Sequence, residues 1–411
     1  MAPRRVSLAF LIDALGWEYV EPDGFASELS QCRVPLRTVL GYSSAAIPSI
    51  LSGLRPAQSG HWNFFYYSPD TSPWRRYRSF LRLTPKWLLH LNSLACRLRP
   101  RLDRAAAKSE SITGYFKSYE IALDRLPLFD TCERKSPFER KGLNAGQSIF
   151  DRLDAAGLSY CKYHYPSTDS DSIDACEKAI QDGHAPYHFL YLTEVDGFLH
   201  ARCTDRAAVR ERLRWYEAAI RRLVRVAEEA GAEEVHVSVF SDHGMTPVTK
   251  TADLKADLAT LPLTPDRDYV AMLDSTMARF WIRSPHAAEP LRKLLESRDY
   301  GRLLSRSELE REGVRFDDER FGEWVFLTET GTILCPSDLG REAPDGMHGF
   351  DPEDRWSHGC FLANFQPSTP RHITDLHELM VREAEWAHDS TRPITREAPS
   401  LARPQRKEVR Q

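Results

Sequence analysis

The chain has 411 residues, of which 42% are hydrophobic and 10% aromatic. This composition supports a sizeable folded core and excludes a disordered chain. The formal net charge of −4 gives no reason to expect a nucleic acid polymer as partner. The eight cysteines are scattered without CxxC spacing, which excludes a zinc ribbon or thioredoxin motif and favours a reducing compartment. We therefore expect a cytoplasmic protein.

The N-terminal segment predicts a buried strand rather than a signal peptide. Its apolar run, residues 6–12, stops at Asp13, and no small-residue cleavage site follows. A continuous apolar run is typical of a parallel strand that is covered on both faces. No segment has the ~20 apolar residues needed to span a membrane.

The next predicted element is a short helix over residues 43–53. Ser43 or Ser44 would cap its N-terminus, and Gly53 would end it. Pro48 fits such a helix only if it lies in the first turn or if the helix is distorted there.

Residues 72–140 combine dense positive charge with apolar and aromatic side chains, a pattern typical of basic amphipathic helices. We predict that they form an insertion. One interpretation is a solvated cap whose long side chains cover apolar surface with their stems. The other is a rim that attracts an anionic or lipid-linked substrate, or that contacts a membrane surface. The basic residues are Arg75, Arg76, Arg78, Arg82, Lys86, Arg97, Arg99, Arg101, Arg104 and Lys108.

Helices and strands alternate from about residue 144 to residue 242, which predicts a doubly wound α/β layer. The expected helices cover residues 144–157, 171–182 and 205–230, and the strands cover 158–163, 188–195 and 235–241. The fold class is thus α/β, with a mixed but mostly parallel sheet and helices on both faces.

The domain organisation follows from these elements. We expect an α/β core made of residues 1–71, 141–250 and 341–389, interrupted by the basic helical insertion 72–140 and by a small α+β cap, 251–340. Within that cap, strands are predicted over 276–282 and 323–328, and a helix over 287–297. Residues 390–411 are rich in Pro, Arg and polar residues, and we expect them to form a disordered tail.

Three carboxylates follow apolar strands of this predicted sheet. Asp13 ends the first strand, Asp196 follows the strand at 188–195, and Asp242 follows the strand at 235–241. His200 comes four residues after Asp196, and His243 directly follows Asp242. Ligands bind at the carboxyl ends of strands in open α/β sheets. One such Asp is ordinary turn chemistry, but three with nearby histidines predict a metal site with mixed O and N ligands.

Five sequence blocks, in this order, resemble the alkaline phosphatase superfamily and most closely its type I phosphodiesterase/nucleotide pyrophosphatase branch. The blocks are Leu-Ile-Asp-Ala-Leu-Gly at 11–16, the Gly-Tyr-Ser-Ser segment at 41–60, Asp-Gly-Phe-Leu-His at 196–200, Ser-Asp-His-Gly-Met at 241–245 and Gly-Met-His-Gly at 346–349. One position departs from the family pattern. Ser59 stands where a His is common, and His61 follows instead.

The resemblance implies an alkaline-phosphatase-like fold with cap insertions, two divalent metal ions and a serine nucleophile at a helix N-terminus. Counting ten residues back from Gly53 gives Ser43 as the nucleophile, with Ser44 as the neighbouring register. Zinc is expected, with manganese or iron as alternatives. The implied ligands are Asp196, His200 and His348 for one metal, and Asp13, Asp242, His243 and the Ser43 oxygen for the other. Asn63 is expected to contact a phosphate oxygen.

The function implied is hydrolysis of phosphate esters through a phosphoserine on Ser43, with diesters or pyrophosphates as the leading substrates. The partner would be a phosphorylated small molecule or a lipid-linked substrate. A phosphomonoesterase acting on a sugar, nucleotide or natural-product phosphate is the alternative, and a non-catalytic phospholipid- or glycan-binding module is a third. The motifs that sulfatases and cofactor-independent phosphoglycerate mutases carry at the nucleophile are absent from the Ser43 segment.

Overall fold

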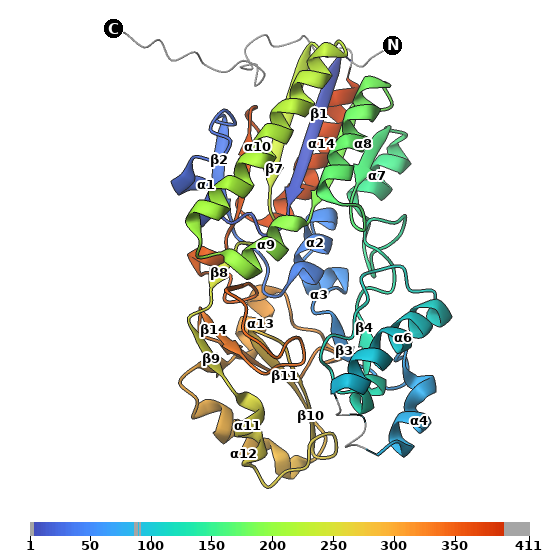
Figure 1. Cartoon of the computed structure of the whole chain (residues 1–411), viewed down its shortest axis with the longest axis vertical. Coiled ribbons are helices and arrows are strands. Elements are labelled where there is room, and N and C mark those ends of the chain that lie inside the picture. Colours follow the sequence, from blue (N-terminus) through green and yellow to red (C-terminus); the bar gives the residue numbers. More distant parts are fainter. Residues whose placement is uncertain (1–3, 86–88, 90–91, 390–411) are drawn as a thin grey trace. The chain divides into compact units, whose positions relative to one another are not determined.

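The computed structural model describes residues 4–85, 89 and 92–389. The chain divides into two compact units (Figure 1). The first contains Met1–Thr38, Ile149–Met245 and Arg355–Gln411, and the second contains Val39–Ser148 and Thr246–Asp354. The predicted disordered tail and Lys86 of the basic insertion lie outside the described residues.

The first unit is built on a six-stranded sheet in the order β2-β16-β7-β1-β6-β5. Parallel pairs join β1 to both β6 and β7, and β5 to β6, while β16 runs antiparallel to β7 and β2. This mostly parallel sheet confirms the predicted fold class. The strands are β1 Arg5–Ile12, β2 Cys32–Leu36, β5 Tyr160–Tyr163, β6 Tyr187–Leu192, β7 Glu234–Phe240 and β16 Gly359–Ala363.

Helices cover both faces of this sheet. On one face α8 and α10 pack together, and their apolar side chains share a core with β1, β6 and β7. On the other face α14 packs against β1 and α7. The helices are α1 Trp17–Asp23, α7 Ile149–Ala156, α8 Asp169–Gln181, α9 Glu194–Arg202, α10 Arg206–Glu229 and α14 Leu376–His388, with 3-10 turns at Arg355–Ser357 and Ile373–Asp375.

Helix α10 illustrates why apolar residues at helical spacing predicted this helix correctly. Val209, Leu213, Tyr216 and Ile220 are buried at helical spacing, so one stripe of the helix faces the core. The carboxylate of Asp205 accepts the Ala208 N–H at 3.1 Å and caps the N-terminus.

One predicted strand was too long. The run 188–195 is apolar throughout most of its length, but β6 ends at Leu192 and α9 begins at Glu194. Val195 is buried as predicted, but it reaches the core from the first turn of α9. Asp196 therefore lies on a helix and not directly at a strand end.

The second unit contains a four-stranded antiparallel sheet, β10-β11-β13-β12, and three two-stranded pairs, β14-β9, β15-β8 and β3-β4. Its strands are β3 Phe65–Tyr67, β4 Phe129–Thr131, β8 Thr246–Pro247, β9 Lys250–Ala252, β10 Tyr269–Leu273, β11 Met277–Ile282, β12 Gly301–Leu303, β13 Trp324–Thr328, β14 Thr332–Leu334 and β15 Gly346–Met347. Its helices are α2 Ser43–Ser52, α3 Pro56–Ser59, α4 Arg78–Leu83, α6 Asn92–Glu110, α11 Leu254–Ala259, α12 Pro285–Glu296 and α13 Arg306–Glu312, with 3-10 turns at Arg75–Tyr77 and Leu123–Leu128.

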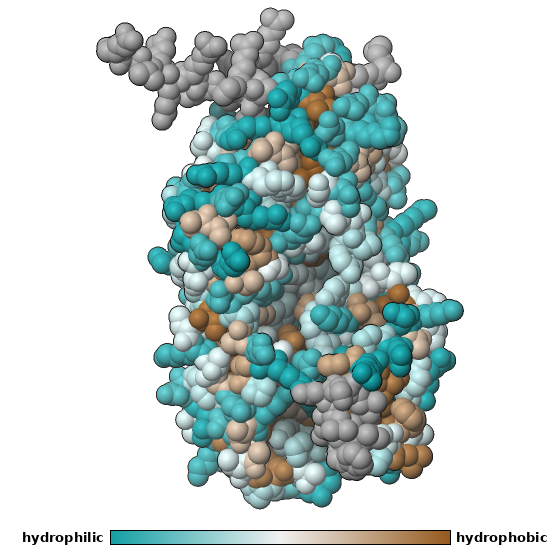
Figure 2. Space-filling view, in the orientation of Figure 1, coloured by the Kyte–Doolittle hydropathy of each residue, from teal (hydrophilic) through white to brown (hydrophobic). Residues whose placement is uncertain are grey.

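Helix α2 forms as predicted and ends at Gly53, which adopts a left-handed conformation with φ of 71°. It continues through Pro48, which lies beyond the first turn. Within the described part of the chain, every helix is too short or too polar to cross a bilayer. On the face shown in Figure 2, hydrophilic side chains predominate and hydrophobic ones occur in scattered groups.

Candidate active site

The first unit places Asp13 at the carboxyl end of β1, between the ends of β6 and β7. Its side chain is 5% exposed, and its Oδ2 accepts a hydrogen bond from the Tyr191 hydroxyl at 2.5 Å. The chain turns sharply here because Ala14 adopts a φ of 61°, a conformation that a residue with a Cβ seldom takes. Backbone strain of this kind persists where the surroundings enforce it, as they do at functional sites.

Asp242 and His243 follow β7 on the neighbouring strand. The buried Asp242 accepts the N–H of the turned Ala14 at its Oδ1, at 3.2 Å. The ring of His243 has its Nδ1 2.9 Å from the Gly244 carbonyl oxygen, so Nδ1 carries the proton and donates. The other nitrogen, Nε2, then faces Asp242 Oδ2 at 3.1 Å and Asp13 Oδ1 at 3.5 Å.

This arrangement needs a cation. Among the described residues Asp13 Oδ1 has no hydrogen-bond partner, and Asp242 Oδ2 has His243 Nε2 as its near neighbour. Without a metal, His243 can serve both oxygens only when Nε2 is protonated as well, because a neutral imidazole would point its lone pair at them. A metal ion bound by Nε2 and both carboxylates removes that conflict, and a ligating histidine usually donates its other N–H to an oxygen in this way. The donor set of carboxylate oxygens and one imidazole suits a divalent transition metal.

The pKa shifts of Asp13 and His243 also indicate an excess of negative charge at this site. Burial, followed by the charges of Asp242 and Asp196, raises the pKa of Asp13 well above its ordinary value. Burial alone would lower the pKa of His243, but Asp242 and Asp13 outweigh it and raise that pKa to about 10. The site thus holds more negative charge than its protein groups neutralise comfortably, because a buried carboxylate is costly without a partner.

The residue after the Asp-His pair, Gly244, must be a glycine for steric reasons. A Cβ at this position would lie 2.2 Å from the Trp356 carbonyl oxygen, and the Gly244 N–H donates to the Ser357 carbonyl at 3.0 Å. Only a glycine allows the two segments to approach this closely.

Asp196 and His200 lie one turn apart on α9, with His200 Nε2 3.4 Å from Asp196 Oδ1. Asp13, Asp196 and His243 each offer one ligand atom, and these three atoms lie within 4.8 Å of one another. The first unit therefore brings together the carboxylates that the sequence placed after three separate strands.

The second unit carries Ser43, Ser44, Asn63 and His348. Ser43 is the first residue of α2 and is half-buried, where backbone N–H groups of the first turn are available to an anion. Ser44 is 2% exposed, and its hydroxyl donates to the Trp62 carbonyl at 2.7 Å. This contact favours Ser43 over Ser44 as the reactive hydroxyl.

A hydrogen-bond network ties the start of α2 to the Gly-Met-His-Gly loop. The Tyr42 hydroxyl contacts Thr276 Oγ1 at 3.0 Å, and Thr276 Oγ1 donates to the Gly349 carbonyl at 2.8 Å. The Tyr42 ring also meets the His348 ring edge-on, with 5.6 Å between centroids. Gly349 is required here because its φ is 90° and a Cβ would lie 2.8 Å from Tyr42.

Asn63 is fully buried, and its Oδ1 has no hydrogen-bond partner within the described residues. In the part of the chain that the structure describes, its Nδ2 has the Met277 sulfur as its one hydrogen-bond partner, at 3.5 Å, so the amide retains capacity for a ligand. His61, beside the departure at Ser59, accepts the Asn144 N–H at 2.9 Å from a buried position. Its role is structural, as expected for a satisfied core histidine.

The model of the type I phosphodiesterase / nucleotide pyrophosphatase family matches residues 7–351. The chain belongs to this family.

Solved structures agree on the fold. Murine ectonucleotide pyrophosphatase / phosphodiesterase 5, in an inactive form in complex with AMP, has a TM-score of 0.65 and 15% sequence identity, and the match covers 93% of this chain and 95% of that one. The human counterpart has a TM-score of 0.64 and 14% identity with the same coverage. No curated protein sequence matches the chain. The alkaline-phosphatase-like architecture predicted from the sequence is confirmed, and the family is one of phosphate ester hydrolases.

Sequence reasoning missed residues that position the candidate metal ligands of this phosphodiesterase-family chain. Asp169, at the start of α8, accepts the N–H groups of Thr193 and Glu194 at 2.8 and 3.2 Å and so caps α9 from a distance. It also accepts the Tyr216 hydroxyl at 2.5 Å. No local signal marks such a cap, because it depends on tertiary contact. Tyr191 could have been suspected, since it lies near the end of the strand that precedes Asp196.

Proposed function

We propose that this chain hydrolyses phosphodiesters or pyrophosphates with two divalent metal ions and Ser43 as nucleophile. The observation that carries the proposal is the geometry around His243, whose Nε2 faces one oxygen each of the two buried carboxylates Asp13 and Asp242, at 3.5 and 3.1 Å. Membership of a phosphodiesterase / nucleotide pyrophosphatase family indicates that a cation at this site would serve phosphate ester hydrolysis.

The residues take distinct roles in this mechanism. Asp13, Asp242 and His243 would hold one ion, and Asp196 and His200 would hold the other, to which the sequence pattern adds His348. When bound, the ions lower the pKa of the attacking hydroxyl and neutralise charge on the phosphoryl oxygens. The Ser43 oxygen attacks phosphorus, a Ser43–phosphate bond forms, and the ester bond to the leaving group breaks. Water then cleaves the phosphoserine and restores the hydroxyl. Asn63 donates its amide N–H to a phosphoryl oxygen.

A nucleotide-type substrate is the leading choice, since the murine relative is described in complex with AMP. A monoester carries more charge, and additional cations would have to bind it. Two arginines of the basic insertion have other partners: Arg75 pairs with Glu110 at 3.0 Å, and Arg99 donates to the Ser118 carbonyl at 3.2 Å. The family description, type I phosphodiesterase / nucleotide pyrophosphatase, favours the diester over the phosphomonoesterase alternative.

The deciding experiment compares an aryl phosphodiester with the matching monoester on zinc-loaded and manganese-loaded protein. We expect faster cleavage of the diester. Faster cleavage of the monoester would favour the phosphatase alternative, and no turnover of either by the metal-loaded protein would favour a binding module. The same assay identifies the metal, for which zinc is our expectation.

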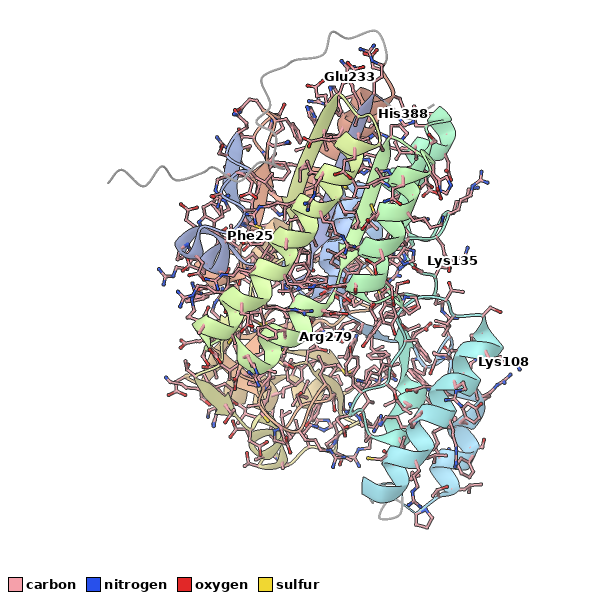
Figure 3. The ribbon with its side chains drawn as sticks, turned by 45° about the horizontal axis from the view of Figure 1, so that its top comes forward. Phe25, Lys108, Lys135, Glu233, Arg279 and His388 are labelled. Carbon is pink, nitrogen blue, oxygen red and sulfur yellow. The ribbon has the colours of Figure 1, made fainter. Side chains whose placement is uncertain are left out.

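The exposed side of α6 supports the membrane interpretation of the basic insertion. Arg97, Arg101, Arg104 and Lys108 are all exposed at helical spacing, and none carries an ion pair within the described residues. Lys108 extends away from the helix in Figure 3. The proposal is that this stripe contacts anionic lipid while the enzyme acts on a lipid-linked substrate. Each basic residue near an anionic bilayer adds about 1 kcal/mol of attraction.

Co-sedimentation with phosphatidylcholine vesicles, with and without phosphatidylserine, tests this contact. Combined Arg97→Gln, Arg101→Gln and Arg104→Gln changes should abolish the phosphatidylserine-dependent binding, whereas Arg214→Gln with Arg225→Gln, two exposed positions of α10, should not. Equal binding of both variants to phosphatidylserine vesicles would show that the basic stripe of α6 is not the membrane contact. The cytoplasmic location stays a prediction; none of the eight cysteines, all of which lie in the described residues, forms a disulfide.

A further inference from the structure

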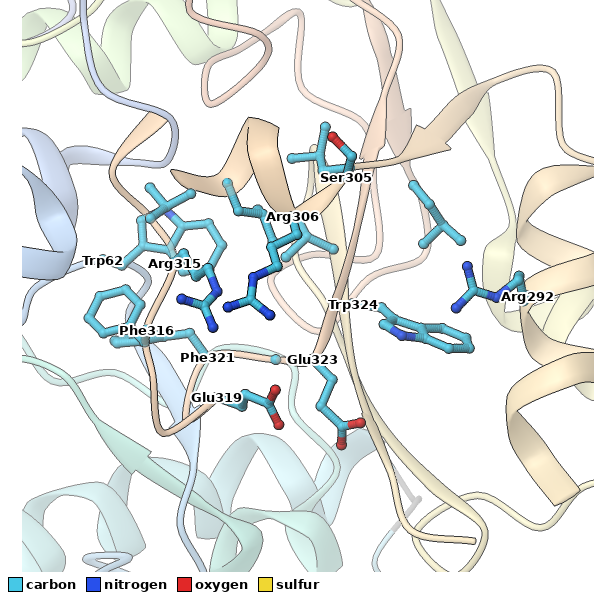
Figure 4. A pocket seen from close by; sticks show the side chains of 16 residues that line it. Trp62, Arg292, Ser305, Arg306, Arg315, Phe316, Glu319, Phe321, Glu323 and Trp324 are labelled. Atoms are coloured by element: carbon cyan, nitrogen blue, oxygen red, sulfur yellow. The ribbon is translucent and has the colours of Figure 1, made fainter. Parts of the chain in front are cut away.

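A pocket of about 300 Å³ lies within the second unit, away from the side chains assigned above except for Trp62. Its walls come from α12, α13, the loop 314–323 and β13 (Figure 4). This volume is at the lower end of the range for small-molecule sites, which combine apolar walls with a few convergent polar groups. Both kinds of group are present here.

Two guanidinium groups converge in this pocket. Arg306 Nε lies 3.1 Å and Arg315 Nη1 lies 3.6 Å from the same atom, Oε1 of Glu310. Two positive groups thus share one carboxylate oxygen of Glu310, which is 51% exposed, and Arg315 Nη1 also pairs with Oδ1 of the 95% exposed Asp317 at 3.0 Å. Exposed pairs of this kind contribute about 0–1 kcal/mol, so a phosphate, which guanidinium groups bind in a bidentate manner, can compete with Glu310.

The rest of the lining suits a flat ring that carries N–H donors. Phe316 and Trp324 are half-buried and offer aromatic surface, and Arg292 lies over the Trp324 ring at 4.6 Å. In Figure 4 the carboxylates of Glu319 and Glu323 lie across the opening from the Arg306 and Arg315 guanidinium groups. Glu319 is exposed and carries no ion pair within the described residues, so it can accept a hydrogen bond from an amino group.

We propose that this pocket is a second ligand site that binds a nucleoside monophosphate, with its phosphate between Arg306 and Arg315 and its base amino group at Glu319. The base stacks on the Trp324 ring. The ligand can be a product released by the chain or a free cellular nucleotide, since the chemistry is the same.

Trp62 connects this pocket to the start of α2. Its ring stacks on Phe316 with 6.3 Å between centroids. Its Nε1 donates to the Leu40 carbonyl at 2.7 Å, and its own carbonyl accepts the Ser44 hydroxyl. A ligand that shifts Phe316 therefore acts on the segment that holds Ser43. This coupling rests on the proposed role of Ser43, whereas the binding does not.

Isothermal titration of the metal-loaded full chain with AMP tests the binding. Arg315→Gln and Arg306→Gln should each weaken one AMP-binding event by at least about tenfold. Arg311→Gln removes the same charge from α13, at a position paired with Glu312 outside the pocket, and should leave that event unchanged. Adenosine and ribose 5-phosphate should each bind more weakly than AMP, because each lacks half of the recognised groups. Thermal unfolding of each variant checks that it folds.

The inference is overturned if the two pocket variants bind AMP as Arg311→Gln does while remaining folded. Asp242→Asn separates this result from the catalytic proposal, because it disables the metal centre and should leave the pocket event intact. Coupling is measured by AMP inhibition of diester cleavage. We expect a lowered kcat in the unsubstituted chain, of about fivefold, and purely competitive inhibition in Arg315→Gln. Purely competitive inhibition by AMP in both the unsubstituted chain and Arg315→Gln would show that the pocket does not affect catalysis, while the binding site itself would stand on the titration result.

Discussion

The acidic cluster of the first unit (Asp13, Asp196, Asp242 and His243) and the arginine pocket of the second unit (Arg306 and Arg315) differ in how their charges are buried and neutralised. In the cluster, carboxylates are buried with too few protein cations: Asp13 and Asp242 are 5% and 0% exposed. In the pocket, the charges are at the surface and already paired, since Arg306 is 72% exposed and contacts Glu310. A buried excess of negative charge favours a tightly bound cation, whereas exposed ion pairs leave room for a ligand that binds reversibly.

The largest expected effect comes from removing charge in the cluster. Asp242→Asn keeps the size of the side chain and the acceptor for Ala14, but it loses the charge that holds the ion. We expect diester cleavage to fall on the order of 10⁴-fold, with loss of bound metal measured by elemental analysis. Asp154→Asn, at an exposed position of α7, is the matched control. Full activity in Asp242→Asn would show that the cluster is structural.

The next effect separates the two serines of the second unit. Ser43→Ala should lower turnover by about 10³-fold or more while retaining metal, because its hydroxyl is the proposed nucleophile. Ser44→Ala should retain most activity and lose about 1–2 kcal/mol of stability, because it breaks the 2.7 Å hydrogen bond to Trp62. Turnover and thermal unfolding are measured on both. Unchanged turnover in both variants would leave the mechanism without a nucleophile.

Much of the cluster was predictable because its ligands follow elements with strong local signals. The strands β1 and β7 are continuous apolar runs, so Asp13, Asp242 and His243 could be placed at one sheet edge. The boundary of β6 was missed because Val195 is equally apolar in a strand or in a helix that packs on the same core. The pocket could not be predicted at all. Its arginines and aromatic residues are brought together by the packing of α12, α13 and β13, and side-chain convergence of this kind leaves no periodicity in the sequence.

A smaller effect is expected from Asp169, which shapes the cluster without touching an ion. The Asp169 carboxylate oxygens accept hydrogen bonds from the Thr193 and Glu194 N–H groups and from the Tyr216 hydroxyl. Asp169→Asn removes one of these two oxygens, so the N-terminus of α9 loses part of its cap. Substitutions of this kind typically cost about 10–100-fold in metal affinity. Metal titration followed by kcat at saturating metal should show weaker binding with largely restored turnover. Asp174→Asn, an exposed position on the same helix, is the control, and equal metal affinity in both would limit Asp169 to a structural role.

The last prediction has the smallest expected effect on catalysis, and it tests whether the second unit also buries a charge that it does not stabilise. Glu133 is 8% exposed, its Oε2 accepts the Tyr115 N–H at 3.3 Å, and burial raises its pKa from 4.5 to about 7. Because the folded chain holds this proton more tightly than the unfolded chain, the stabilisation is complete below pH 4.5 and is lost as the pH rises through about 7.

Glu133→Gln is neutral at every pH and should escape this loss. Its free energy of unfolding should match the unsubstituted chain near pH 4.5 and exceed it above pH 7 by on the order of 3 kcal/mol. Urea unfolding at both pH values measures the difference, and Glu139→Gln, an exposed position nearby, should show none. Catalytic constants should not move, because no metal ligand is involved. An equal gain in both variants would mean that Glu133 stays charged, and the contrast would then hold only for the acidic cluster.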